Sequence, residues 1–282
     1  MVVHPPDNHS SPEGARGAIE VRDYGESGPL VILLHGGPGA PGPMAPVARG
    51  LAEGFRVLEP FQRGSGGEPL TVARHVADLR DLVESLPPEP RPALVGSSWG
   101  AMLALAFAAA HPDLAGPLVL IGCGTFDIGA RARMREILDA RMDDELRRRL
   151  ANLAEECIDP DERLRVQGRL ILPLYSYDPN AGELELGACD ARANRETWDD
   201  MVRLQQEGVY PAAFSAIRRP VLMLHGDADP HPGRMIQASL QPYLPQLEYR
   251  EWERCGHYPW LERAAREEFF ACLREWLAAH TS

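Results

Sequence analysis

The chain has 282 residues, of which 44% are hydrophobic and 25% charged, the balance typical of soluble globular proteins. This composition excludes disorder of the whole chain, and no apolar run approaches the roughly 20 residues that a membrane span needs. The net charge is −12, and all 29 basic residues are arginines scattered along the chain, so nucleic-acid binding is not expected. The five cysteines are widely spaced and form no CxxC pair, which argues against a disulfide framework or a zinc site.

The cysteine pattern also suits a reducing cytoplasm, so we expect a cytoplasmic protein with no membrane association. Residues 1–13 contain three prolines among polar residues, and we expect them to be disordered. They include neither the basic region nor the apolar region of a secretory signal.

Short apolar runs alternate with helical patterns along most of the chain. The runs cover residues 18–21, 30–34, 56–58, 93–95, 118–121, 221–224 and 247–252. Between them, residues 71–86 repeat apolar side chains every three or four positions, and residues 99–111 are alanine-rich and apolar on all sides. This alternation predicts an α/β fold with a mostly parallel sheet covered by helices on both faces.

The alternation stops between residues 124 and 216. Met134, Leu138, Met142, Leu146 and Leu150 recur every fourth residue and predict one helical ladder, and further helices are expected near 161–173 and 190–206. We interpret 124–216 as a helical cap inserted into a core formed by 14–123 and 217–282. Such a cap would cover the carboxyl edge of the sheet, where open α/β sheets bind their ligands.

The segment Gly96-Ser97-Ser98-Trp99-Gly100 has the form G-x-S-x-G between a predicted strand and a predicted helix. In this context the motif is typical of a sharp turn that exposes a nucleophilic serine, here Ser98. The alternative is an ordinary turn rich in glycine and serine.

A glycine-rich loop, His35-Gly36-Gly37-Pro38-Gly39, follows another predicted strand. Glycines at this place can turn a backbone N–H toward a developing oxyanion. A phosphate-binding loop of the GxxxxGK[ST] type is excluded because the chain has no lysine. We expect His35 to pack the loop rather than to act as a base.

A nucleophilic serine needs a base, and the base needs an acid to orient it. Asp229 follows a predicted strand, and His257 follows the last one, which gives the chain order Ser98, Asp229, His257. Asp227 competes for the role of acid, and His231 is an alternative base. The sequence contains no recognisable metal or nucleotide motif, so we expect no cofactor.

The motifs HGGPG, GSSWG, GDAD and GHYPWLE, in this order, resemble the α/β-hydrolase family and in particular its proline iminopeptidase branch. The resemblance covers roughly residues 15–123 and 217–282. It implies that Ser98 is the nucleophile, Asp229 the acid and His257 the base. It also implies that the oxyanion is bound by the backbone N–H groups of Trp99 and of Gly37, with Gly36 as the alternative to Gly37.

This sequence departs from the branch at three places. Phe61 stands where the branch has the Asp of D-Q-R-G-S-G, and Ser97 replaces a glycine of its G-G-S-W-G motif. The branch binds the substrate amine with cap carboxylates, one of them in a Trp-Glu segment, for which Trp198-Asp199 is the nearest match here. Other candidate carboxylates are Glu183, Glu185 and Glu196.

The predicted function is therefore a serine hydrolase that cleaves an ester or amide of a small molecule or short peptide through an acyl-enzyme on Ser98. The candidates are an aminopeptidase of the proline iminopeptidase kind, a small-molecule carboxylesterase and a non-catalytic binding homologue. The oligomeric state is left open.

Overall fold

The computed structural model describes residues 19–41, 44–180 and 187–281. The expected disorder of residues 1–13 and the candidate carboxylates Glu183 and Glu185 lie outside these ranges. No helix in these ranges is long and apolar enough to cross a membrane.

Seven strands form one sheet in the order β1-β3-β2-β4-β5-β6-β7. All neighbouring strands pair in parallel except β1, which runs antiparallel to β3. The strands are β1 (Val21–Tyr24), β2 (Leu30–Leu34), β3 (Arg56–Pro60), β4 (Ala93–Ser97), β5 (Leu118–Ile121), β6 (Val221–Gly226) and β7 (Leu247–Trp252). The α/β fold with a mostly parallel sheet is confirmed.

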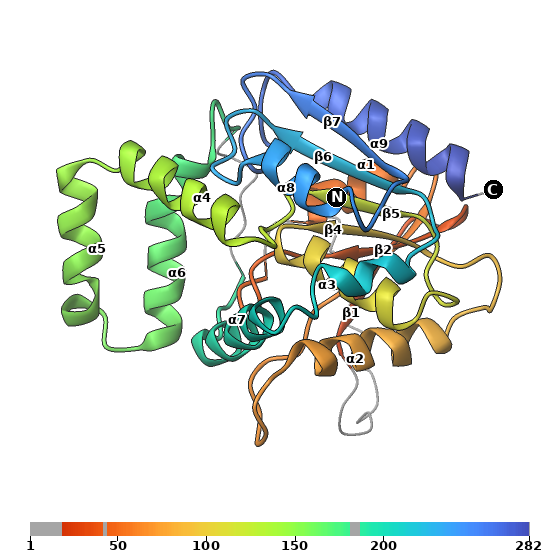
Figure 1. Ribbon diagram of the computed structural model, residues 1–282, viewed down its shortest axis with the longest axis horizontal. Coiled ribbons are helices and arrows are strands. Elements are labelled where there is room, and N and C mark those ends of the chain that lie inside the picture. The colour runs from red at the N-terminus through yellow and green to blue at the C-terminus, as the bar shows by residue number, and fades with distance from the viewer. Residues whose placement is uncertain (1–18, 42–43, 181–186, 282) are drawn as a thin grey trace, which may run out of the picture.

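Helices cover both faces of this sheet (Figure 1). Because successive side chains of a strand point to opposite faces, Ile32 and Leu34 of β2 join one apolar core, and Val31 and Leu33 join the other. The first core includes residues of α2 (Val72–Glu84), α3 (Trp99–Ala110) and α8 (Gly233–Leu240), and the second includes residues of α1 (Ala45–Leu51) and α9 (Arg266–His280). This two-sided burial explains why the strands are almost continuously apolar.

The strand order reverses at β2, which lies between β3 and β4. The loops that follow β2 and β4 therefore leave the same edge of the sheet side by side. A Cβ atom placed on Gly36, after β2, would lie 3.1 Å from the Cβ of Ser98, after β4. The fold thus brings the two glycine-containing motifs together at the point where α/β sheets bind ligands.

The segment between β5 and β6, which we interpret as a cap, is helical. It contains α4 (Ile128–Arg141), α5 (Asp144–Glu156), α6 (Pro160–Ile171), the 3-10 helix η1 (Leu172–Tyr175) and α7 (Ala191–Gln206). Figure 1 shows α5 and α6 as a green hairpin that projects to one side of the sheet, while α7 lies closer to the core. A second 3-10 helix, η3 (Ala212–Ala216), packs its Phe214 into the core that contains α3.

The helices expected near 161–173 and 190–206 are present, but the single ladder from Met134 to Leu150 is wrong. The helix α4 ends at Arg141, and a new helix starts after Asp143. The carboxylate of Asp143 accepts the backbone N–H of Leu146 and so caps the start of α5. The regular spacing of apolar residues thus continues across two separate helices, and the capping residue Asp143 marks the start of the second.

Candidate active site

Ser98 occupies a sharp turn between β4 and α3. Its φ of 54° and ψ of −116° lie where residues other than glycine are uncommon. The flanking glycines permit the turn, because a Cβ on Gly96 would overlap the backbone of Gly100, and a Cβ on Gly100 would overlap the carbonyl oxygen of Leu34. The G-x-S-x-G spacing thus has a steric cause.

The backbone N–H groups at this turn have different environments. The N–H of Ser98 donates to the carbonyl oxygen of Ile121 on β5, at 2.8 Å. Trp99 is the first residue of α3, so its N–H has no acceptor within the helix. It remains the predicted oxyanion donor on this side.

The structure pairs His257 with Asp229 and not with Asp227. Nδ1 of His257 lies 2.7 Å from Oδ2 of Asp229, and both side chains are buried. Asp227 is exposed, and its carboxylate accepts the N–H of Cys255 at 3.3 Å. Since an ionised carboxylate only accepts, Nδ1 of His257 carries the proton and Nε2 keeps the lone pair that a base requires.

The charge of Asp229 is maintained by its surroundings. Burial by itself would raise the pKa of this carboxyl, but the neighbouring His257, His231 and His225 outweigh that effect and hold the pKa well below its ordinary value. Asp229 is therefore an anion at neutral pH and can stabilise an imidazolium on His257.

Ser98 and His257 both line one cavity of about 470 Å³, within the usual range for small-molecule sites. Gly36, Gly37 and Trp198 line the same cavity. The predicted nucleophile and base, the glycine loop and one cap residue are thus brought together, with Asp229 behind His257.

The glycine loop is held by His35 and Gln62. Nδ1 of His35 donates to the carbonyl oxygen of Gly36 at 2.8 Å, and its Nε2 accepts the N–H of Gln62 at 3.1 Å. Burial lowers the pKa of His35 to about 4, so the ring stays neutral and can both donate and accept. Gly37 has a φ of +56°, which a glycine adopts without strain. His35 thus packs the loop, as its position in the sequence indicated.

Gln62 also connects this loop with the serine turn. Its amide nitrogen donates to the carbonyl oxygen of His35 at 3.0 Å, and its Oε1 accepts the indole N–H of Trp99 at 2.6 Å. Gln62 lies in the segment that resembles the D-Q-R-G-S-G motif of the family, but the sequence does not indicate that it links the two oxyanion candidates.

The model of the Alpha/beta hydrolase family matches residues 31–271 of this chain. The chain belongs to this family.

Relatives of this hydrolase act on different substrates. The 2-hydroxy-6-oxo-2,4-heptadienoate hydrolase of Pseudomonas putida is 28% identical over 282 residues, covering 93% of this chain and 94% of its own. The proline iminopeptidase of Arabidopsis thaliana is 40% identical, but only over 101 residues that cover 33% of this chain and 26% of its own. The structure of the enol-lactonase from Burkholderia xenovorans LB400 superimposes with a TM-score of 0.61 at 20% identity, covering 92% of this chain and 96% of that one. The match to this proline iminopeptidase thus covers about a third of the hydrolase.

In this hydrolase the start of α7 rests on the glycine loop. The backbone N–H of Asp190 donates to the carbonyl oxygen of Gly39 at 2.6 Å, and the Asn194 amide donates to that of Pro38 at 2.7 Å. The Asp190 carboxylate accepts the backbone N–H groups of Ala193 and Ser65. The cap is therefore fixed to the core beside Ser98.

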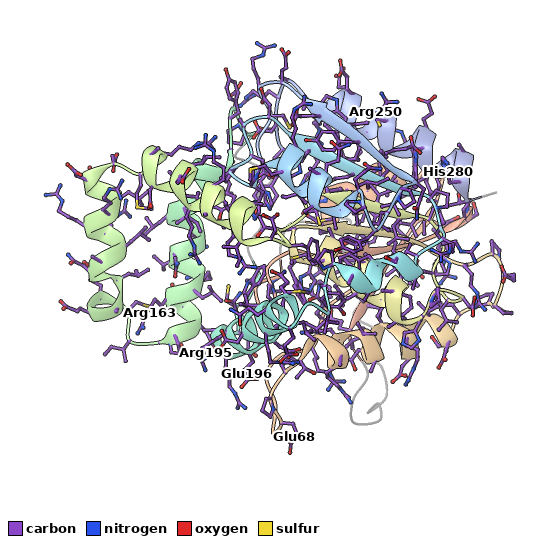
Figure 2. All side chains as sticks on the ribbon, viewed as in Figure 1. Glu68, Arg163, Arg195, Glu196, Arg250 and His280 are labelled. Carbon is purple, nitrogen blue, oxygen red and sulfur yellow. The ribbon has the colours of Figure 1, made fainter. Side chains whose placement is uncertain are left out.

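Two of the predicted amine-binding carboxylates lie elsewhere. Asp199 is exposed on α7 and does not line the cavity, because the neighbouring Trp198 takes the inward position against Trp99. Glu196 accepts the backbone N–H of Leu70 at 2.8 Å and pairs with Arg192, and Figure 2 shows it on α7 near the loop that carries Glu68. The expectation that Asp199 binds a substrate amine is corrected by this geometry, whereas Trp198 does line the cavity.

Cations line the cap side of the cavity of this hydrolase. Arg131, Arg135 and Arg165 contribute to its wall, whereas none of the described lining residues is an aspartate or glutamate. Arg165 is paired with Glu162. Arg131 instead donates to Oε1 of Gln205, whose amide nitrogen donates to the carbonyl oxygen of Thr125 at 3.1 Å. Arg131 is thus held by a neutral partner and forms no ion pair with the described residues, although the more distant Asp127 partly offsets its charge.

Asp229, His231 and His257 are the one group within the described ranges with donor atoms close enough together to hold a metal ion. Both Nδ1 atoms and both carboxylate oxygens are already engaged with one another through hydrogen bonds.

Proposed function

We propose that this α/β-hydrolase cleaves a small carbonyl compound that carries a carboxylate, by acyl transfer through Ser98. The observation that carries the proposal is the make-up of the cavity, with Ser98 and His257 at its core side, Arg131 on its cap side, and no acidic residue among its described lining residues. The bond cleaved is an ester or a carbon–carbon bond next to a ketone, in line with the names of the lactonase and heptadienoate hydrolase to which the chain is similar.

The proposed reaction starts with proton transfer from Ser98 Oγ to Nε2 of His257 as Oγ attacks the carbonyl carbon. Asp229 holds the ring in the required tautomer and stabilises the imidazolium. The N–H groups of Trp99 and Gly37 bind the oxyanion. The imidazolium returns its proton to the departing ester oxygen or enolate carbon, and water then releases the acyl group from Ser98 by the same route.

The aminopeptidase alternative requires the opposite electrostatics. A substrate with a free ammonium group needs a carboxylate facing the cavity, and the described residues place arginines there instead. Because neither Asp199 nor Glu196 lines the cavity, the ester-type hydrolase is the better-supported function.

The proposal is tested with two p-nitrophenyl esters. One is p-nitrophenyl hydrogen adipate, which ends in a carboxylate, and the other is methyl p-nitrophenyl adipate, in which that carboxylate is a neutral methyl ester. A hydrogen bond to a charged group contributes about 1.5–3 kcal/mol, so Arg131→Gln should raise KM for the anionic ester by roughly 10- to 100-fold. KM for the neutral ester should change by less than about twofold, because that ester does not use the charge.

Arg133→Gln is the matched control. Arg133 lies on the same helix, is exposed, pairs with Glu136 at 3.0 Å and does not line the cavity. The control should leave KM for both esters unchanged. Equal effects of Arg131→Gln on the two esters would show that Arg131 does not bind a substrate carboxylate.

A further inference from the structure

Asp229 holds two cavity-lining histidines, one on each carboxylate oxygen. His257 occupies Oδ2, as described above. Nδ1 of His231 lies 3.0 Å from Oδ1, and the backbone N–H of His231 donates to the same oxygen at 2.9 Å. A serine–histidine–aspartate triad requires only one imidazole, so the second one needs an explanation.

The rings of His231 and His257 are stacked, with centroids 4.6 Å apart and planes inclined by 22°. Both rings line the cavity, and the side chain of His231 is only 12% exposed. Because Nδ1 of each ring faces a carboxylate oxygen, both carry the proton on Nδ1 when neutral. Two imidazoles in the same tautomer thus share one anion.

Several other groups face this pair. His225 points its Nε2 toward Oδ2 of Asp229 at 3.2 Å and toward the carbonyl oxygen of His231 at 2.9 Å. Tyr175 of η1 packs against both stacked rings, and Tyr258 packs edge-on against His257. Burial lowers the pKa of His231, and this effect exceeds the opposing effect of Asp229, which raises it. The ring of His231 is therefore neutral at neutral pH.

We propose that His231 is a positioning residue that tunes His257 through the carboxylate they share. Its Nδ1–H stabilises the negative charge on Asp229, and this weakens the pull of that carboxylate on the proton of His257. Asp229 consequently holds the Nδ1 proton of His257 less tightly than it would without the Nδ1–H donor of His231. The stacked ring also restricts rotation of the His257 imidazole.

Two substitutions separate the hydrogen bond from the ring. His231→Phe keeps a ring against His257 and removes the donor, whereas His231→Asn keeps an amide N–H near the position of Nδ1 and removes the ring. We expect His231→Phe to raise the acid midpoint of the kcat/KM profile by about one pH unit. We expect His231→Asn to leave this midpoint within about 0.3 unit of the wild type.

The profile is measured with methyl p-nitrophenyl adipate, and thermal melts establish that each variant is folded. An unchanged midpoint in folded His231→Phe would overturn the inference, and so would equal shifts in both variants, because the donor would then have no role. A lower kcat or a changed KM without a shift of the midpoint would indicate that His231 has a purely structural role and would also contradict the inference.

The inference rests on the proposed function, so a second readout independent of turnover accompanies the kinetics. The ring proton signal of His257, assigned by comparison with His257→Gln, is followed by NMR as a function of pH. Its midpoint should move upward in His231→Phe and stay in place in His231→Asn. An inactive wild type would refute the proposed function, whereas the NMR midpoints would still decide the role of His231.

Discussion

Replacing Asp229 by Asn removes the charge at the centre of the proposed triad and keeps the shape of the side chain. The carboxylate accepts from Nδ1 of His257, from Nδ1 and the backbone N–H of His231, and lies 3.2 Å from Nε2 of His225. An asparagine offers only one accepting oxygen for these groups. If its amide nitrogen faces His257, the imidazole must accept with Nδ1 and carry its proton on Nε2.

In that tautomer His257 has no lone pair for the proton of Ser98. The corresponding substitution in a well-studied serine protease triad lowers kcat about 10⁴-fold, and we expect a loss of the same order here. Asp227→Asn is the matched control, because Asp227 lies two residues away, is exposed and accepts only the N–H of Cys255 among the contacts described above. Its kcat should stay within about threefold of the wild type.

The assay is hydrolysis of methyl p-nitrophenyl adipate by both variants at pH 7.5, with circular dichroism and thermal melts to establish folding. Equal losses in the two variants, or a loss below about tenfold in folded Asp229→Asn, would refute the assignment of Asp229 as the acid.

Two further predictions concern the scaffold of the site. Gly100→Ala should lower the free energy of unfolding by at least about 3 kcal/mol, because the new Cβ would overlap the carbonyl oxygen of Leu34. Gly66→Ala is the control and should be nearly neutral, because its Cβ meets nothing within 4 Å. Urea unfolding measures the stability of both variants, and equal stability would contradict the prediction. The pKa of His35 falls from 6.5 to about 4 on folding, so between these pH values the unfolded chain binds a proton that the folded chain does not. Lowering the pH from 6.5 to 4 should therefore decrease the free energy of unfolding by up to about 3 kcal/mol through this residue. His35→Gln should show a shallower fall between pH 6.5 and 4, and an unchanged slope would contradict the prediction.

The core of the fold could be predicted from the sequence because each local pattern in it has a physical cause. Buried parallel strands must be continuously apolar, and the turn at Ser98 requires glycines at 96 and 100 because other residues would overlap the backbone. The order of the serine, acid and histidine along the chain was therefore enough to predict which side chains lie at one edge of the sheet.

The cap could be predicted only as a set of helices. Helical periodicity does not specify which way a helix turns when it docks, and α7 places Trp198 inward and Asp199 outward. Arg131 is one of 29 scattered arginines, and nothing in its local sequence indicates that it faces the cavity. The pairing of His231 with Asp229 depends on the path of the loop after β6, which the sequence pattern does not define.

The most direct test of the account is labelling of the folded protein with a fluorophosphonate probe, followed by intact-mass measurement and peptide mapping. Such probes react with a serine whose hydroxyl is activated by a base and whose oxyanion is stabilised. The account predicts a single adduct on Ser98 that is absent from folded Ser98→Ala, which should also lose at least about 10³-fold in kcat. Folded wild-type protein that forms no adduct, or forms it on another residue, would contradict the claim that Ser98 is the nucleophile.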